Sequence, residues 1–409
     1  MSALAGVLPG AADLRRPGAP GAALRLLAGG AAGTLLFAVV SGATGDRAAH
    51  RLLAALALPP LLALLLAAAV AHRRLLAPTT VTIVAFLAAA TVTARTPHIA
   101  LAALSFAAAL ALVPATFRGE PVARGAWRDY LTLTKPRIMS LLLITGAAGT
   151  VVGAGGWPGT ARFAETMVGL ALACGGASAL NHVIDRDIDK LMGKRTAGRP
   201  VAAGRLTAAR GLEFGLTLSA ASFVLLASTV NLLTAALALA GNLFYVLVYT
   251  GFLKRRGPQN IVIGGAAGAV PPLVGCAAGG GHLGLSALWL FGIVFLWTPP
   301  HFWALALLLR DHYAAADVPM LPVVRGERST VRQIVVYTLA LVAFTAAPVL
   351  TGTFGWTYLA GALVLGGVFV ALAARLGDGT DRRRAAVCFH WSLLYLALLF
   401  AVAAIDAAI

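Results

Sequence analysis

The stretch FAETMVGLALACGGASALNHVIDRDIDK, residues 163–190, joins a long apolar run to a group of carboxylates. Its first part holds about 20 mostly apolar residues, enough for a helix to cross the ~30 Å hydrocarbon core of a bilayer. Its second part places three aspartates within five residues, where that helix would leave the hydrocarbon. The stretch therefore predicts a membrane-spanning helix with an acidic group at its rim.

The whole chain is as rich in apolar residues as the first part of this stretch suggests. Of 409 residues, 59% are hydrophobic and 11% are charged, and the mean hydropathy is +0.86. A soluble domain carries about a quarter charged residues, so we expect an all-α fold, a polytopic membrane helical bundle. Nine spans are expected at residues 138–155, 163–183, 211–228, 231–251, 261–279, 285–305, 334–351, 356–374 and 387–408.

Four further spans are expected before these nine, near residues 27–43, 53–71, 79–94 and 99–116. They suggest that the chain has an N-terminal extension, residues 1–116, followed by a nine-helix domain, residues 117–409. No residue in the extension indicates a chemical role. Its function is left open.

The net charge of +17 raises the possibility of nucleic acid binding, but its placement argues against it. The segment before the first of the nine spans and the loops after the even-numbered spans carry 23 Lys and Arg, and the other loops carry one. This is the positive-inside pattern, which places the basic loops and the N-terminus in the cytoplasm and the C-terminus outside. Because the N-terminus does not read as a transit peptide, we expect a bacterial plasma membrane.

The acidic group has a regular spacing. Asn181, Asp185 and Asp189 lie four residues apart, within an arc of about 80° on one helix face, whereas Asp187 points elsewhere. An ordinary solvated helix end is the simpler interpretation of such charges. Here, however, the group continues into a span, where ionisable groups cost about 2.5–3.5 kcal/mol each and are usually functional. Oxygen ligands suit Mg²⁺, so we interpret the group as a magnesium site that receives a substrate phosphate.

Three basic or mixed loops on the same predicted side add candidate phosphate ligands. The segment MGKRTAGRP supplies Lys194, Arg195 and Arg199, whose guanidinium and ammonium groups suit a diphosphate. A second loop holds Asp311, Tyr313 and Asp317; if it is helical up to Pro319, Tyr313 and Asp317 share a face. A third loop holds Tyr249 and Lys254, while Arg255 and Arg256 are more typical of topology determinants.

Four stretches carry a resemblance to a known family: TKPRI (134–138), NHVIDRDIDKLMGKRTAGRP (181–200), YTGFLKRRGPQNIVIGGAAGAVPPLVG (249–275) and WTPPHFWALALLLRDHYAAADVPMLPVV (297–324). They resemble the intramembrane aromatic prenyltransferases of the UbiA superfamily, and most closely the members that farnesylate heme. The likeness runs from about residue 128 to the C-terminus and implies nine membrane helices. The superfamily's second acidic motif has acids four residues apart, whereas residue 315 here is alanine.

The resemblance implies that farnesyl diphosphate, heme b and water give heme O and diphosphate. It implies Mg²⁺ on Asn181, Asp185, Asp189, Asp311 and Asp317, the first four being catalytic. It also implies diphosphate and substrate binding by Arg137, Lys194, Arg195, Arg199, Tyr249, Lys254 and Tyr313. His301, after two prolines in the sixth span, is either a heme contact or a hydrogen-bonded structural histidine. Heme A synthase, which acts on the product, is an expected partner.

Two other functions remain as alternatives. A prenyltransferase of the same superfamily that acts on a quinone precursor would share the diphosphate site but would need no room for a porphyrin. A secondary transporter would place charged groups along a path at mid-membrane depth. The acids of this chain cluster at one predicted face instead, which favours the enzyme.

Overall fold

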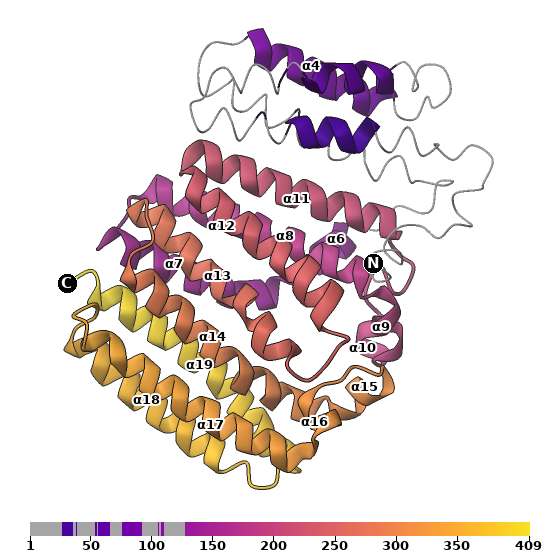
Figure 1. Ribbon diagram of the computed structural model, residues 1–409. Coiled ribbons are helices and arrows are strands. Elements are labelled where there is room, and N and C mark those ends of the chain that lie inside the picture. The colour runs from indigo at the N-terminus through magenta and orange to yellow at the C-terminus, as the bar shows by residue number, and fades with distance from the viewer. Residues whose placement is uncertain are drawn as a thin grey trace. The chain divides into compact units, whose positions relative to one another are not determined.

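The computed structural model describes residues 127–409 and, before them, the helical stretches 27–35, Leu56–Leu65 and Leu76–Thr91 with a few isolated positions. Within this described part, every element is a helix and none is a strand (Figure 1). The spans expected at 27–43, 53–71 and 79–94 lie only partly in the described residues. The span expected at 99–116 and the domain boundary at 116 lie almost wholly outside them.

Nine helices of the described chain are long and apolar enough to cross a membrane, which confirms the predicted membrane helical bundle. They are α7 (Pro136–Ala154), α8 (Thr160–Ile184), α11 (Ala208–Thr229), α12 with η3 (Leu232–Leu253), α13 (Asn260–Gly280), α14 (Leu285–Leu308), α17 with η4 (Gly326–Val349), α18 (Trp356–Ala374) and α19 (Arg382–Asp406). The connecting segments form the short helices α6 (Trp127–Leu133), α9 (Arg186–Leu191), α10 (Lys194–Ala197), α15 (Arg310–Ala315) and α16 (Leu321–Val324).

The largest differences from the predicted spans are at the starts of α17 and α19. These were expected at 334 and 387 but begin at Gly326 and Arg382. Their first turns carry charged side chains, so hydropathy falls there although the backbone is already helical. The Asp381 carboxylate caps α19 by accepting from the backbone N–H groups of Arg383 and Arg384.

The chain divides into two compact units. Unit 1 comprises Met1–Lys135, Leu172–Arg186 and Arg199–Ala236, and unit 2 comprises Pro136–Ala171, Asp187–Gly198 and Leu237–Ile409. In unit 1, the Ser178 hydroxyl donates to the Leu133 carbonyl at 2.7 Å, which ties the end of α6 to α8. A buried cluster of Leu133, Ala179, Val183, Val201 and Leu206 packs around this contact. The first acidic segment is thereby anchored at its membrane end.

Unit 2 contains a very close helix pair, α7 and α13. A Cβ added at Gly149 would overlap the backbone of Pro272, and one added at Gly275 would overlap the backbone of Gly146 and Thr150. Gly153 and Gly279 continue the contact one turn further along each helix. Small residues at this spacing let membrane helices approach until their backbones touch.

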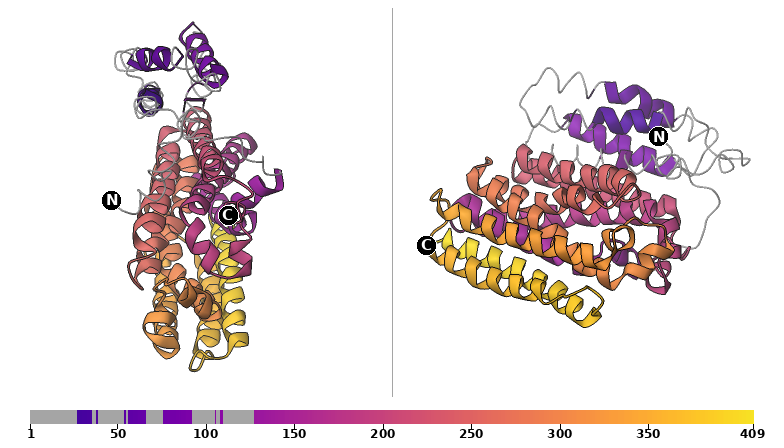
Figure 2. Two further views of the ribbon diagram at one scale, coloured as in Figure 1. Left: turned by 90° about the vertical axis from the view of Figure 1, so that its right-hand side faces the viewer. Right: turned by 60° about the horizontal axis from the view of Figure 1, so that its bottom comes forward.

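The rest of unit 2 has a large aromatic and aliphatic core. The side chains of Tyr358, Phe369, Tyr395 and Phe400, from α18 and α19, are fully buried. Figure 2 shows α17, α18 and α19 running side by side. At one end of this unit lie the short helices α9, α10, α15 and α16 (Figure 1), which carry much of the candidate site.

Candidate active site

A series of hydrogen bonds in unit 1 leads to the first carboxylate. The Lys135 ammonium donates to Asn181 Oδ1 at 2.7 Å, and Asn181 Nδ2 donates to Asp185 Oδ2 at 2.8 Å. Asn181 is 3% exposed and Asp185 is 1% exposed. Because an amide oxygen accepts and an amide nitrogen donates, these two partners fix the orientation of the Asn181 side chain. In this structure Asn181 positions Asp185, and its role as a metal ligand stays a prediction.

Lys135, which the sequence indicated only as a topology charge, belongs to this series of hydrogen bonds. It lies between α6 and α7 with a φ of 50°, a conformation that residues other than glycine rarely adopt. Such strained backbone positions cluster at functional sites. The sequence signal was the Lys-Pro pair in TKPRI, because a residue before proline is disfavoured in a helix. Arg137, two residues later, is exposed at the start of α7.

The acidic stripe is not one continuous helix face as expected. Helix α8 ends at Ile184 and α9 begins at Arg186. The interruption is only one residue long, since the Asp185 N–H still bonds to the Asn181 carbonyl at 2.9 Å. Asp187 is exposed, as its position on the other face predicted, whereas Asp189 is 1% exposed. Asp185 and Asp189 are thus buried carboxylates, which proteins keep only with compensating charge or bonds.

An apolar cluster in unit 2 joins the second half of this segment to the other two loops. Ile188 of α9 packs with Ile261 of α13, Ala306 of α14 and Tyr313 of α15, and Tyr249 lies against the same cluster. Within unit 2, parts of all three loops therefore pack together, and their convergence on one metal and phosphate site stays a prediction. The side chain of Lys194 is exposed, that of Arg199, in unit 1, is partly buried, and that of Arg195 lies outside the described part.

Two of these loops are in close contact at Gly193. Its φ is 99° and its ψ is 173°, a region that is essentially restricted to glycine. A Cβ at this position would lie 2.8 Å from Cδ2 of His312, next to Asp311. Glycine at 193 is therefore required both by the backbone and by the neighbouring ring.

We expect Gly193→Ala to lower the midpoint of thermal unfolding more than Gly204→Ala does. Gly204 also has a positive φ, 74°, but has open space around it, so it tests the backbone penalty of about 1–3 kcal/mol without a clash. The double variant Gly193→Ala/His312→Ala lacks the imidazole ring, so its midpoint of thermal unfolding should be higher than that of Gly193→Ala alone. Equal effects of Gly193→Ala and Gly204→Ala would show that the two loops are not in tight contact.

The second acidic loop is less buried than the first. Tyr313 is 9% exposed, but Asp311 and Asp317 are both exposed. Helix α15 ends at Ala315 rather than continuing to Pro319, and Asp317 has a φ of 50°, so Tyr313 and Asp317 do not share a helix face. Glu327 lies 3.5 Å from both Arg310 and Arg382, which ties this loop to α17 and α19.

The third loop contains an unusual helix. The π-helix η3 (Phe244–Leu253) follows α12, and π-type hydrogen bonds are frequent at functional sites. Its last bond runs from the Lys254 N–H to the Tyr249 carbonyl at 2.9 Å. Lys254 is only 8% exposed, whereas Arg255 and Arg256 are exposed. A buried ammonium is a suitable ligand for an anion.

His301 lies inside unit 2 in a stack of rings. Its ring is 4.2 Å from that of Trp297 and 4.8 Å from that of Phe389, and Nδ1 is 2.7 Å from Ser392 Oγ. The Ser392 hydroxyl donates to the Phe389 carbonyl at 2.6 Å, so it accepts from His301. Nδ1 therefore carries the hydrogen, and Nε2 keeps its lone pair. The Nδ1 nitrogen therefore holds the ring in place through a structural hydrogen bond, and the Nε2 nitrogen is a potential metal ligand.

The donor set fits a hard divalent cation. Among the described residues, no three His, Cys, Asp or Glu side chains form a group able to hold a metal ion. Mg²⁺ commonly binds through one or two carboxylates and completes its shell with waters and substrate phosphates. Asp185 in unit 1 and Asp189 in unit 2 are each a buried carboxylate of the kind that Mg²⁺ binds, and neither is one of the sulfur or imidazole ligands that zinc prefers.

Comparison with known proteins identifies the family of this chain. The model of the UbiA prenyltransferase family matches residues 142–399. A protein named protoheme IX farnesyltransferase from Symbiobacterium thermophilum is 54% identical over 285 residues, 68% of this chain and 94% of the relative. One of the same name from Gloeobacter violaceus is 49% identical over 290 residues, 71% of this chain and 95% of the relative.

A third relative of that name, from Thermus thermophilus, is 50% identical over 295 residues. The match covers 71% of this chain but 48% of the relative, so the chain spans about half the length of that protein.

Solved structures share the fold at low sequence identity. A digeranylgeranylglyceryl phosphate synthase has a TM-score of 0.58 at 17% identity and covers 69% of this chain and 98% of its own. A UbiA homolog from Archaeoglobus fulgidus, bound to DMAPP and Mg²⁺, has a TM-score of 0.50 at 16% identity and covers 67% and 98%. With the family model matching more than half of its residues, the chain belongs to the UbiA prenyltransferase family.

Proposed function

We propose that this protein transfers the farnesyl group of farnesyl diphosphate to a vinyl group of heme b, with addition of water, to give heme O and diphosphate. The observation that carries the choice of acceptor is the identity of 49–54% to relatives named protoheme IX farnesyltransferase, across nearly their whole length. The geometry supports the chemistry, because two buried carboxylates and a buried lysine lie in the loops that the family motifs mark.

The carboxylates would hold the magnesium ion that accompanies the diphosphate. Asp185 and Asp189 are the ligands best supported by burial, and Asn181, Asp311 and Asp317 are the further predicted ones. Bound magnesium would neutralise charge on the departing diphosphate. Lys135 and Asn181 would keep the Asp185 carboxylate oriented for this role through their two hydrogen bonds.

The cations would bind the diphosphate oxygens directly. Lys254 is buried and therefore offers a desolvated ammonium, while Arg137 and Lys194 are exposed and Arg199 is partly buried. Arg195 completes the predicted group, with Tyr249 and Tyr313 as hydroxyl donors. Together they would stabilise the charge that develops when the bond between farnesyl carbon and diphosphate oxygen breaks.

The apolar interior would then guide the farnesyl carbon to the acceptor. The heme vinyl group forms the new carbon–carbon bond, and water adds to the resulting cation and loses a proton. A dry bundle protects the allylic cation from earlier attack by water. His301 would contact the heme through Nε2, because its Nδ1 hydrogen is already given to Ser392.

The proposed setting is a bacterial plasma membrane with the site loops on the cytoplasmic side. The distribution of Lys and Arg supports that orientation, 23 in the loops of one side and one in those of the other. Heme O made here would pass to heme A synthase as the next enzyme.

Mass spectrometry of the acceptor tests the proposal. We expect purified full-length protein, given farnesyl diphosphate, Mg²⁺ and heme b, to produce a heme heavier by farnesyl plus a hydroxyl group. Addition of EDTA should stop product formation, and Mg²⁺ in excess should restore it. In a parallel reaction, 4-hydroxybenzoate should remain unmodified. Prenylation of 4-hydroxybenzoate with unchanged heme would instead identify a quinone-precursor enzyme.

A further inference from the structure

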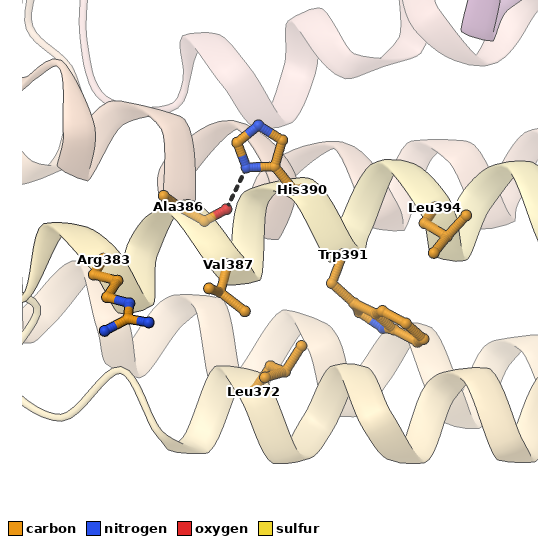
Figure 3. Close-up of a pocket in the computed structure, with 7 residues that line it drawn as sticks. All are labelled: Leu372, Arg383, Ala386, Val387, His390, Trp391 and Leu394. Atoms are coloured by element: carbon orange, nitrogen blue, oxygen red, sulfur yellow. Dashed lines mark hydrogen bonds between the residues drawn. The ribbon is translucent and has the colours of Figure 1, made fainter.

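The shallow depression along helices α18 and α19 is lined almost wholly by apolar side chains, as a surface that faces lipid would be (Figure 3). Of its two charged or ionisable residues, Arg383 and His390, the histidine is already bonded through Nδ1 to the Ala386 carbonyl of its own helix at 2.7 Å. A buried polar atom that lacks a partner is a stronger sign of a ligand. Unit 2 has such an atom at the start of α13.

The atom belongs to Asn260, the first residue of α13, which is 2% exposed. Its Nδ2 donates to the backbone carbonyl of Lys254 at 3.2 Å. Because a carbonyl oxygen only accepts, this bond fixes which end of the amide is the nitrogen and which is the oxygen. The oxygen, Oδ1, then has no hydrogen-bond donor within the described part of the chain.

An acceptor of this kind is unfavourable in a folded protein. A buried oxygen that has left water without gaining a donor lowers the stability of the fold, so proteins keep few of them. An apolar residue of similar size at position 260 would avoid that loss. The amide oxygen of Asn260 therefore points to a donor that comes from a bound ligand.

The neighbours of Asn260 belong to the loops of the candidate site. Lys254, whose carbonyl accepts the amide bond, is the buried cation of the third loop. Ile261, the next residue of α13, packs in one cluster with Ile188 of α9 and Tyr313 of α15. Asn260 therefore lies beside segments of all three loops within unit 2.

Helix α13 also contacts the other predicted ligand of the third loop, Tyr249. Gly264 lies one turn after Asn260 on the same helix face, and a Cβ added there would overlap the ring of Tyr249. That ring also stacks on the ring of Tyr245, with 5.5 Å between the ring centroids. The first two turns of α13 thus hold both Tyr249 and Lys254, and Asn260 supplies the polar contact.

The chemistry of the ligand follows from the unpartnered acceptor. Diphosphate oxygens themselves accept hydrogen bonds at neutral pH, so they would not face Oδ1. A magnesium ion bound to diphosphate usually keeps several waters, and the charge of the ion makes those waters good donors. A magnesium–diphosphate complex would therefore offer anionic oxygens to Lys254 and a metal-bound water to Asn260.

We propose that Asn260 is a further binding residue for the magnesium–diphosphate complex, in which Oδ1 accepts from a metal-bound water while Nδ2 holds Lys254 in place. The inference rests on the proposed function and deepens it, because it adds an uncharged residue of α13 to the site of the leaving group. The bound complex supplies the donor that Oδ1 lacks.

Calorimetric titration of the full chain in nanodiscs with inorganic pyrophosphate, in excess Mg²⁺, tests the role of Asn260. We expect Asn260→Leu, a change to a side chain of similar volume, to weaken pyrophosphate binding at least about tenfold. The midpoint of thermal unfolding without ligand should change little, because the variant loses an unsatisfied acceptor together with one hydrogen bond.

Two further variants separate the amide oxygen from the amide nitrogen and from general effects. Asn260→Asp keeps an acceptor oxygen but cannot donate to the Lys254 carbonyl, and it should bind pyrophosphate more tightly than Asn260→Leu does. Gln259→Leu is the matched control, because Gln259 is the preceding residue, also carries an amide and is exposed. It should bind pyrophosphate as the wild-type protein does.

Wild-type pyrophosphate affinity in Asn260→Leu would overturn the proposal. So would equal losses in Asn260→Asp and Asn260→Leu, because they would assign the whole effect to the bond between Nδ2 and Lys254. The binding readout needs no heme, so it is independent of the acceptor. Weakened pyrophosphate binding in Asn260→Leu, with no farnesylated heme from the wild-type protein, would remove the proposed function alone. Normal heme farnesylation by the wild-type protein, with unchanged pyrophosphate binding in Asn260→Leu, would remove this inference alone.

Discussion

Asp185→Asn should lower the rate constant of prenyl transfer by at least about 100-fold while the protein stays folded. The substitution removes the negative charge but keeps an oxygen that can accept from Asn181 Nδ2, now 2.8 Å from Asp185 Oδ2. Stability should therefore change little, whereas affinity for Mg²⁺ should fall. Single-turnover rates and the Mg²⁺ concentration at half-maximal rate measure the two effects separately.

The matched control is Asp187→Asn, the same substitution two residues away at an exposed position. It should leave the rate within about twofold, since a screened surface charge contributes little. Asp311→Asn in the same assay decides the role of the second loop, and full activity would exclude Asp311 from the site. More than half of the normal rate in Asp185→Asn would contradict the magnesium site as a whole.

Gly275→Val should prevent unit 2 from packing. The added Cβ would overlap the backbone of Gly146 and Thr150, and backbone atoms cannot turn aside as a side chain can. Overpacking in cores commonly lowers the free energy of unfolding by about 1–3 kcal/mol. Because α7 and α13 would have to separate along their length, we expect it to fall by at least about 3 kcal/mol here. The yield of monodisperse protein after detergent extraction and the midpoint of thermal unfolding should both fall sharply.

Gly268→Val provides the control on the same helix. A Cβ at Gly268 meets no atom within 4 Å, so this variant carries the same change in helix propensity without the clash. It should unfold close to the wild-type midpoint. Similar destabilisation by both substitutions would mean that the contact between α7 and α13 is not the sensitive feature.

The membrane helices were predictable because hydrocarbon selects for length and apolar composition before any packing is considered. The same reasoning located the first acidic segment, since carboxylates at the end of a span stand out against apolar neighbours. It also distinguished Lys254, as a candidate anion ligand, from Arg255 and Arg256; Lys254 is buried and the two arginines are exposed, while the role of Lys254 stays a prediction. These features depend on local sequence, and local sequence was sufficient.

Features that depend on distant contacts were not predictable. Lys135 belongs to the site because a strained backbone brings it to Asn181, 46 residues later in the chain. Asp317 leaves the expected helix because α15 stops at Ala315, and a regular period could not show that end. The sequence shows glycines four residues apart at Gly149 and Gly153 and at Gly275 and Gly279. It does not show that these two helices would pack against each other.

The ten-residue π-helix before Lys254 has a consequence for how this loop tolerates change in length. A π-helix accommodates more residues per turn than an α-helix, so deleting one residue within it would let the segment relax to ordinary α-helical winding. Nine residues at α-helical winding cover nearly the same total rotation as ten at the wider π winding, so the later residues would keep their faces and the ammonium of Lys254 would keep its place. A one-residue deletion between Phe244 and Leu253 should therefore be tolerated, whereas an insertion there should displace Lys254.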